Sequence, residues 1–220
     1  MEKRAGDLNN DLEKTSTKQR ILDSATDLFA MKGYTETTIR ELAAVVGVKE
    51  ASIYNHFPSK KAILECILEE YSQFTNSFFD RRDLSMLRDN PTADDILSCM
   101  MLSFPDGKAE YYLKKLCVVL QEQHRNPIVR KFVSEQLILS TEQVSRMVID
   151  KLKEFHILRP DTNPDFWAKM HSSLVYAFDS RLSLGIGDSS PGFSGLGLAE
   201  LLRGLYDMML KTCKIGPHAF

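Results

Sequence analysis

A short polar segment, residues 49–56, carries side chains that can read the edges of DNA bases. Ile53 and Phe57 recur four positions apart, so on a helix they share one buried face. The polar side chains then point outward and supply hydrogen-bond donors, acceptors and a cation, which suits base edges in a major groove. The outward set is Lys49, Glu50, Ser52, Tyr54, Asn55 and His56.

The residues before this segment predict the helix that would hold it in place. Thr38 and Glu41 form a capping-box pair at the start of that helix. Gly47 follows its last turn, where a left-handed residue ends a helix. Two short helices joined by a glycine turn form a helix-turn-helix, so the sequence predicts a DNA-binding module. The apolar face of the first helix, at offsets 0, 3, 4 and 7, consists of Ile39, Leu42, Ala43 and Val46.

Residues 17–63 resemble the DNA-binding domain of the TetR family of bacterial transcriptional regulators. Val46 and Ala51 depart from the family pattern, which usually has a small residue at the first position and often a glycine at the second. The resemblance extends over roughly the first third of the chain, and the rest compares only in length and helical pattern. The matching motifs are Ile21-Leu22, Ala25, Leu28-Phe29, Gly33-Tyr34, Thr37 to Ala43, Gly47-Val48, Ile53 to Phe57 and Ser59-Lys60-Lys61.

The resemblance implies two sets of DNA contacts. Residues near the bases would be Arg40, Lys49, Glu50, Ala51, Ser52 and Asn55. Residues on phosphates would be Thr38, Tyr54, His56 and Lys60, together with the free amide groups at the helix N-termini. Three of these residues have another interpretation: Tyr54 as a half-buried structural tyrosine, His56 as a brace for the loop, and Glu50 as a solvated carboxylate.

Length and charge divide the chain into parts. Its 220 residues are enough for a small domain and a larger one. We expect a disordered arm over 1–15, a helix-turn-helix domain over 16–62, and an effector-binding and dimerisation domain over 63–220. Residues 16–61 carry seven Lys/Arg and five Asp/Glu, whereas residues 62–220 carry 18 and 21. The basic end is the end that would meet phosphate, although the asymmetry is mild.

The hydrophobic pattern predicts an all-α protein with two domains. Thr17 is expected to cap the first helix, which Gly33 closes, and Ser59 to cap a long helix that reaches about residue 79. Residues 185–197 hold five glycines but neither a preceding strand nor a lysine, so we interpret them as an interhelical loop and not as a phosphate cradle. Further helices are predicted over about 92–104, 108–124, 127–155, 164–184 and 198–210.

The last two predicted helices each carry an apolar stripe. In the resembled family these helices pair with those of a second subunit, which implies a homodimer that binds an inverted-repeat operator on double-stranded DNA. An ordinary monomer core also requires one stripe per helix, so that alternative stays open. The stripes are Phe166, Trp167, Met170, Leu174, Ala177, Phe178 and Leu182, and Leu198, Leu201, Leu202, Leu205, Met208 and Met209.

A small apolar effector is the second partner that the resemblance implies, bound among the C-terminal helices. His124 and His171 are polar groups that could fix its orientation in an apolar pocket. A protein partner bound by the second domain, as in a nucleoid or assembly factor, is the alternative. The candidate lining residues are Phe74, Phe78, Met101, Phe104, Tyr112, Gln121, His124, Trp167 and His171, although most Met and aromatic residues at helical spacing belong to a core.

Other classes of function find little support in the sequence. The four cysteines are scattered without metal-ligand or disulfide spacing, so no metal or cofactor is expected. No local signature of a nucleophile, base or oxyanion hole occurs, and we expect no enzyme. No apolar run reaches the length of a membrane span and no signal peptide is recognised, so we expect a cytoplasmic protein without a membrane partner.

Overall fold

A computed structural model describes residues 16–80, 83–100, 107–183 and 197–215, with the side chains of residues 78–80 and 182–183 left out. The predicted arm over 1–15 and nearly all of the predicted loop over 185–197 lie outside this description. The expected all-α fold is confirmed. In the described part of the chain the extended backbone pairing is limited to one antiparallel bridge, between Leu158 and Lys214.

The N-terminal helices follow the predicted order. Ser16 caps the first of them, because its Oγ accepts a hydrogen bond from the Gln19 amide at 3.2 Å. The prediction of Thr17 as the cap was therefore wrong by one residue, and Thr17 is the first helical residue. The helices are α2 (Thr17–Lys32), α3 (Ile39–Val46), α4 (Glu50–His56) and the long α5 (Lys60–Asp80).

The second half of the chain is also helical. A π-helical stretch, η2 (Val133–Leu139), continues α8 into α9, so residues 127–154 form the unbroken helical segment that the sequence predicted. A short 3-10 turn over Ser85–Leu87 was not predicted. The remaining helices are α6 (Ala93–Met100), α7 (Ala109–Glu122), α8 (Pro127–Phe132), α9 (Ser140–Glu154), α10 (Pro164–Ser183) and α11 (Leu198–Cys213).

Two main apolar clusters hold the helices together. The first joins α2, α3 and α4 to the beginning of α5 and also includes Val118, Val119, Val129 and Val133 from the second half. This cluster crosses the domain boundary that we expect at residue 62, so the DNA-binding helices share buried side chains with α7 and α8. The second cluster lies among α6, α9, α10 and α11 and includes Leu152 and Leu202.

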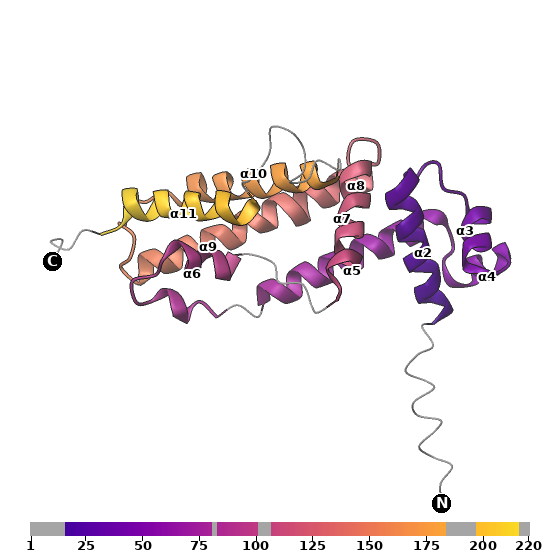
Figure 1. Cartoon of the computed structure of the whole chain (residues 1–220), viewed down its shortest axis with the longest axis horizontal. Helices are drawn as coiled ribbons and strands as arrows, with labels where there is room; N and C mark the ends of the chain where they lie inside the picture. The colour runs from indigo at the N-terminus through magenta and orange to yellow at the C-terminus, as the bar shows by residue number, and fades with distance from the viewer. Residues whose placement is uncertain (1–15, 81–82, 101–106, 184–196, 216–220) are drawn as a thin grey trace, which may run out of the picture.

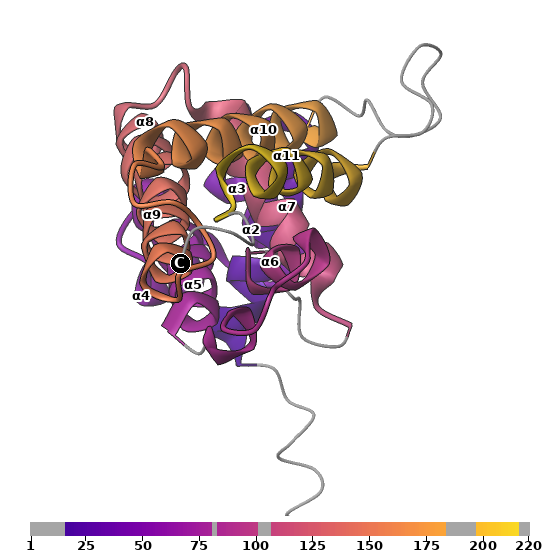
Figure 2. The ribbon, with the colours of Figure 1, turned by 90° about the vertical axis from the view of Figure 1, so that its left-hand side faces the viewer.

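The molecule is elongated, with α2, α3 and α4 at one end and α9, α10 and α11 lengthwise toward the other (Figure 1). In the view turned by 90°, α10 and α11 again lie side by side, and α10 also packs on α9 (Figure 2). No helix of the described part combines the length and apolarity that a membrane crossing requires.

Helix α7 connects the two ends through polar contacts. The Lys114 ammonium pairs with Asp27 at 2.8 Å, although both side chains are largely solvated. The others are hydrogen bonds from Gln19 Nε2 to Tyr111 Oη (3.2 Å), from Gln121 Nε2 to Ala30 O (3.1 Å) and from the Tyr34 amide to Glu122 Oε1 (3.0 Å). A displacement of α7 would therefore be transmitted to α2 and to the loop that follows it.

Candidate functional site

The first helix of the helix-turn-helix is fixed to α2 by charged groups. The Arg20 guanidinium donates to the Val46 carbonyl at the end of α3, with 2.6 Å between the two atoms. Lys32 at the end of α2 forms an ion pair with Glu41 in the first turn of α3. Leu42 in the middle of α3 has 1% of its surface exposed and packs in the first apolar cluster. The position of α3 is thus set at both ends and in the middle.

The turn between the two helices has the predicted caps. Thr38 Oγ1 accepts a hydrogen bond from the Glu41 amide at 3.2 Å. Gly47 adopts φ 76° and ψ 35°, and its amide donates to the carbonyls of Ala43 and Ala44. This left-handed conformation is strained for residues with a side chain, so the glycine is required by the turn itself.

The outward face predicted for the second helix is present on α4. Ile53 and Phe57 are buried in the first apolar cluster and orient the helix. Tyr54 leaves 50% of its surface exposed, so the phosphate contact and the half-buried structural role both stay predictions. Of the ten predicted DNA contacts, Ser52 and Lys60 are partly buried, and the exposed ones are Thr38, Arg40, Lys49, Glu50, Ala51, Tyr54, Asn55 and His56.

Lys60 has a role that the sequence did not indicate. Its ammonium group donates to the carbonyls of Tyr34 and Thr37, both at 2.8 Å, and approaches that of Thr35 at 3.3 Å. It also lies 4.4 Å from the centre of the Tyr34 ring. Burial lowers the pKa of Lys60, and the carboxylates of Glu122 and Glu36 oppose that shift. The residue braces the loop before α3, and a phosphate contact from the same group stays a prediction.

We expect Lys60→Met to lower thermal stability, because three carbonyl groups lose a charged donor. A hydrogen bond to a charged group contributes about 1.5–3 kcal/mol, so a net loss of about 1–2 kcal/mol and several degrees in the melting temperature is expected. Lys61→Met is the control, since Lys61 is exposed and has only an i,i+4 ion pair with Glu65 at 3.5 Å. Equal melting temperatures for the two variants in circular dichroism would contradict the bracing role.

Small and apolar residues recur at exposed or partly exposed positions of both α10 and α11. On α10 four of the exposed positions recur at helical spacing, Phe166, Met170, Ser173 and Ala177, and the exposed charged residues Asp165 and Lys169 lie next to the first two in the sequence. On α11 the small and apolar residues at outward positions are the partly exposed Leu201, then Gly204 and Met208, which is 46% exposed. A Cβ atom added at Gly204 would meet no atom within 4 Å. We call these seven residues the outer stripe.

The other residues of the predicted α11 stripe point inward. Leu202, Leu205 and Met209 are at most 5% exposed and belong to the second apolar cluster. The helix therefore divides the stripe between a monomer core and an outward face, and Leu205 lies in the core. The sequence pattern could not separate the two faces because both are apolar.

The predicted effector residues lie at different places. Phe74 and Tyr112 stack, with 3.8 Å between ring centres. Trp167 and His171 are buried near the second apolar cluster, Gln121 binds α2, and His124 is exposed. His171 Nδ1 lies 2.7 Å from Tyr206 Oη and 3.2 Å from Ser145 Oγ, so this ring nitrogen is bonded to side chains within the protein. Met101, Phe104 and the side chain of Phe78 lie outside the described residues.

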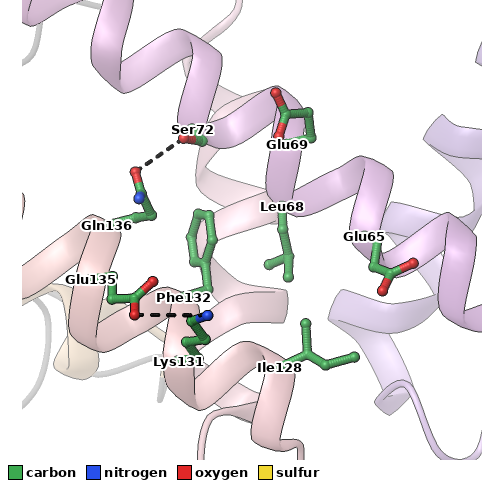
Figure 3. A pocket seen from close by; sticks show the side chains of 9 residues that line it. All are labelled: Glu65, Leu68, Glu69, Ser72, Ile128, Lys131, Phe132, Glu135 and Gln136. Atoms are coloured by element: carbon green, nitrogen blue, oxygen red, sulfur yellow. Dashed lines mark hydrogen bonds and ion pairs between the residues drawn. The ribbon is translucent and has the colours of Figure 1, made fainter.

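A shallow groove between α5 and the α8–η2 segment contains none of these residues (Figure 3). Leu68, Ile128 and Phe132 form its apolar floor, and its volume is about 280 Å³. Ser72 donates to Gln136 Oε1 across the groove at 3.2 Å. The size lies at the lower limit for small-molecule sites. The remaining lining residues are Glu65, Glu69, Lys131 and Glu135.

Two functional candidates were missed in the sequence. Glu122 on α7 is 4% exposed and accepts a hydrogen bond from the Tyr34 amide. Nothing in the sequence around Glu122 distinguishes it from other glutamates on a helix. Asp179 on α10 is enclosed enough that burial raises its pKa from 3.8 to about 7. A signal for Asp179 was available, because it interrupts the apolar stripe beside Phe178. In the described part of the chain no group of His, Cys, Asp and Glu is arranged to hold a metal ion.

The fold and the exposed face of α4 define the class: a helix-turn-helix protein with a DNA-binding surface at one end and a helical second domain. Residues 21–67 match the family described as "Bacterial regulatory proteins, tetR family". The chain is 34% identical over 73 residues to the HTH-type transcriptional regulator YvkB of Bacillus subtilis. It is 50% identical over 48 residues to IcaR of Staphylococcus aureus, a negative transcriptional regulator of the biofilm operon icaADBC.

These alignments cover 33% and 22% of the chain, and 39% and 26% of the two relatives. Solved structures resemble the chain over most of its length. A transcriptional regulator from Saccharomonospora viridis in complex with choline matches 90% of this chain and 98% of its own, with a TM-score of 0.59 and 24% identity. A TetR-family regulator from Rhodococcus sp. matches 89% and 100%, with a TM-score of 0.65 and 14% identity.

The resemblance to the TetR family is confirmed: residues 21–67 are a TetR-family DNA-binding domain, and the chain as a whole has the fold of TetR-family regulators. The relatives are transcriptional regulators, a class distinct from enzymes.

Proposed function

We propose that the protein is a repressor that binds an inverted-repeat operator as a homodimer and is released by a small molecule. The exposed polar face of α4, presented after a turn and an α3 helix whose predicted caps are in place, carries this proposal. One such module buries little surface on DNA. Two modules about 34–36 Å apart, one helical turn of DNA, would read two half-sites together.

The outer stripe supports a dimer formed through α10 and α11. Exposed Phe166, Met170 and Met208 lie on neighbouring helices, and apolar side chains grouped in this way commonly mark an interface. A glycine at position 204 weakens the helix by about 1 kcal/mol relative to alanine. No neighbouring atom of the chain requires a glycine there, because a Cβ atom would meet nothing within 4 Å. A close approach of a second helix at this position would give the glycine a function.

Selection of bound sequences from random DNA by the purified protein tests the proposal, and we expect an inverted repeat. Affinity for the selected site should fall steeply with salt, because several phosphate contacts per subunit release counterions. A log–log slope of several units is expected in fluorescence anisotropy. A slope near zero, or selection of no sequence, would remove the assignment to DNA.

Lys49→Ala and Asn55→Ala should change which bases are preferred, because both side chains are exposed on the outward face of α4. Each lost base contact is expected to relax discrimination by about 1–3 kcal/mol at one position of each half-site. Lys60→Met should weaken binding to all sequences by a similar factor, because it would remove a phosphate contact or loosen the loop before α3, and neither depends on the base sequence. Selection profiles of the three variants separate the two groups, and a base-specific change in Lys60→Met alone would contradict these roles.

The effector is the second half of the proposal. The structural relative from Saccharomonospora viridis contains choline, so this fold accommodates a small molecule in at least one protein. A second domain that binds a protein partner instead would leave operator affinity unchanged across a metabolite panel. A small molecule that lowers operator affinity about 5- to 150-fold would support the repressor, and DNA must then weaken binding of that molecule by the same factor.

A further inference from the structure

Three consecutive residues at the end of α7 each bind a different element of the protein. Gln121 Nε2 donates to a main-chain carbonyl in the last turn of α2, at 3.1 Å. Glu122 Oε1 accepts a hydrogen bond from the amide of Tyr34, in the loop after α2, at 3.0 Å. Gln123 Oε1 accepts a hydrogen bond from the hydroxyl of Tyr176 on α10, at 2.6 Å. The DNA-binding end and the second domain therefore meet at these three residues, which we call the α7 joint.

Glu122 makes the most enclosed contact of the joint. Its side chain belongs to a residue with 4% of its surface exposed. The oxygen that accepts the Tyr34 amide also lies against the backbone of Gly33, because a Cβ atom placed there would be 3.5 Å from it. A carboxylate forms a stronger hydrogen bond to an amide than a neutral acceptor does, and an enclosed amide without an acceptor is unfavourable. Removal of the Glu122 side chain should therefore release this loop from α7.

The loop that Glu122 holds leads directly into the helix-turn-helix. Thr37 is 1% exposed, and its hydroxyl donates to the carbonyl of Gly33 at 2.9 Å, which closes the loop on itself. The Lys60 ammonium binds the carbonyls of Tyr34 and Thr37 from the start of α5. Because the loop is cross-linked in this way, it moves together with α3. The position of α3 and α4 relative to the second domain thus depends on the contact between Glu122 and the loop.

The other side of the joint is α10, a helix of the proposed dimer interface. Helix α7 lies between α2 and α10 and packs on both (Figure 1). Hydrogen bonds connect α10 through Tyr176 and Gln123 to the end of α7, and from there through Glu122 to the loop before α3. In the proposed dimer α10 would lie at the two-fold axis. The separation of the two α4 helices would then be set in part by this series of contacts.

The spacing of the two half-sites on DNA tests such a connection. One base pair added between the half-sites moves them apart by about 3.4 Å and rotates one relative to the other by about 35°. A module fixed rigidly to its dimer cannot follow that change, and the gain from binding both half-sites is lost when geometry forbids simultaneous contact. A module on a loose connection can follow it. The stiffness of the connection therefore decides how strictly the protein requires one spacing.

We infer that Glu122 is the positioning residue that fixes the half-site spacing of the operator, with Gln121 and Gln123 as the other contacts of the same joint. The inference rests on the proposed function, because it requires a dimer on an inverted repeat. It adds a determinant of specificity that lies outside the DNA-binding helices and is enclosed by protein.

The test measures the affinity of the full chain for three DNA duplexes by fluorescence anisotropy. All three carry the half-sites found by selection, with the selected spacing, one base pair more, or one base pair fewer. The parent protein should prefer the selected spacing by at least about tenfold. Glu122→Ala should lower this preference at least about threefold and leave the preferred bases of each half-site unchanged. Glu122→Gln keeps an acceptor for the amide and should retain most of the preference.

Two control variants separate spacing from stability. Glu154→Ala removes an exposed carboxylate from the end of α9, and Ile96→Val weakens the second apolar cluster, where Ile96 is fully buried. Both should keep the spacing preference of the parent, because neither touches the α7 joint. Tyr176→Phe removes only the hydroxyl that Gln123 accepts, and it should lower the preference in the same direction as Glu122→Ala.

The inference is overturned if the parent binds the three duplexes equally, if Glu122→Ala weakens binding to all three by the same factor, or if a control variant lowers the preference as much. If Glu122→Ala does not fold, Tyr176→Phe decides, and an unchanged preference in that variant overturns the inference. An inverted repeat bound with an unchanged preference in Glu122→Ala removes this role of Glu122 alone. Selection of no sequence by the parent removes the proposed function instead.

Discussion

Met208→Arg is expected to convert the protein from a dimer to a monomer and to lower operator affinity at least about 100-fold. Met208 is 46% exposed on α11, so the monomer can accept the change without loss of its core. In the proposed dimer the two-fold axis would bring two such arginines close together in an apolar interface, where unpaired charges are strongly unfavourable. Two linked half-site contacts typically exceed one by about 10²–10⁴ in affinity, which sets the size of the expected loss.

Asp207→Arg is the control, because it places the same side chain one position earlier on an exposed side of α11 that is not part of the outer stripe. It should leave the dimer intact in analytical ultracentrifugation. Leu205→Arg should behave differently from both, since Leu205 is 5% exposed in the core and an arginine there should unfold the second domain. A stable Met208→Arg dimer that still binds its operator would exclude this interface.

The helix-turn-helix could be predicted from the sequence because its determinants are local. Thr38, Glu41 and Gly47 act within a few residues of their own positions, and the structure has each of them in the predicted role. Ile53 and Phe57 orient α4 through the four-residue spacing alone. The first cap was missed by one residue because serine and threonine are adjacent at 16 and 17 and have similar capping tendencies.

The second domain was predictable only as a set of helices. Which apolar residues of α11 face the core depends on α6 and α10, which are distant in sequence, so Leu205 and Met208 could not be distinguished. The same holds for polar groups. Lys60 donates to the carbonyl of Tyr34, which is 26 positions away in the sequence, and Glu122 accepts the amide of Tyr34 from 88 positions away. No local pattern in the sequence indicates either contact. The burial that raises the pKa of Asp179 likewise arises only in the folded protein.

Asp179→Asn is expected to stabilise the ligand-free protein, and by more at pH 8 than at pH 4. Burial raises the pKa of Asp179 in the folded protein from 3.8 to about 7. The folded state then binds the proton more tightly than the unfolded state, so the contribution of this group is fully present below about pH 4 and is lost as the pH rises toward 7. A shift of about three units corresponds to about 4 kcal/mol, and partial exposure of the side chain reduces the expected loss to about 2–4 kcal/mol.

The measurement is the difference in unfolding free energy between Asp179→Asn and the parent, from urea titrations at several pH values between about 4 and 8. Titratable groups that do not feel the charge of Asp179 cancel in that difference. Tyr71 and Cys117 do feel it, but burial and that charge raise their pKa values above the ordinary 10.0 and 9.0, so both groups stay neutral between pH 4 and 8. We expect the difference to be near zero at the acid end and to grow toward pH 8. A difference that is constant with pH would mean that Asp179 is ionised and solvated throughout.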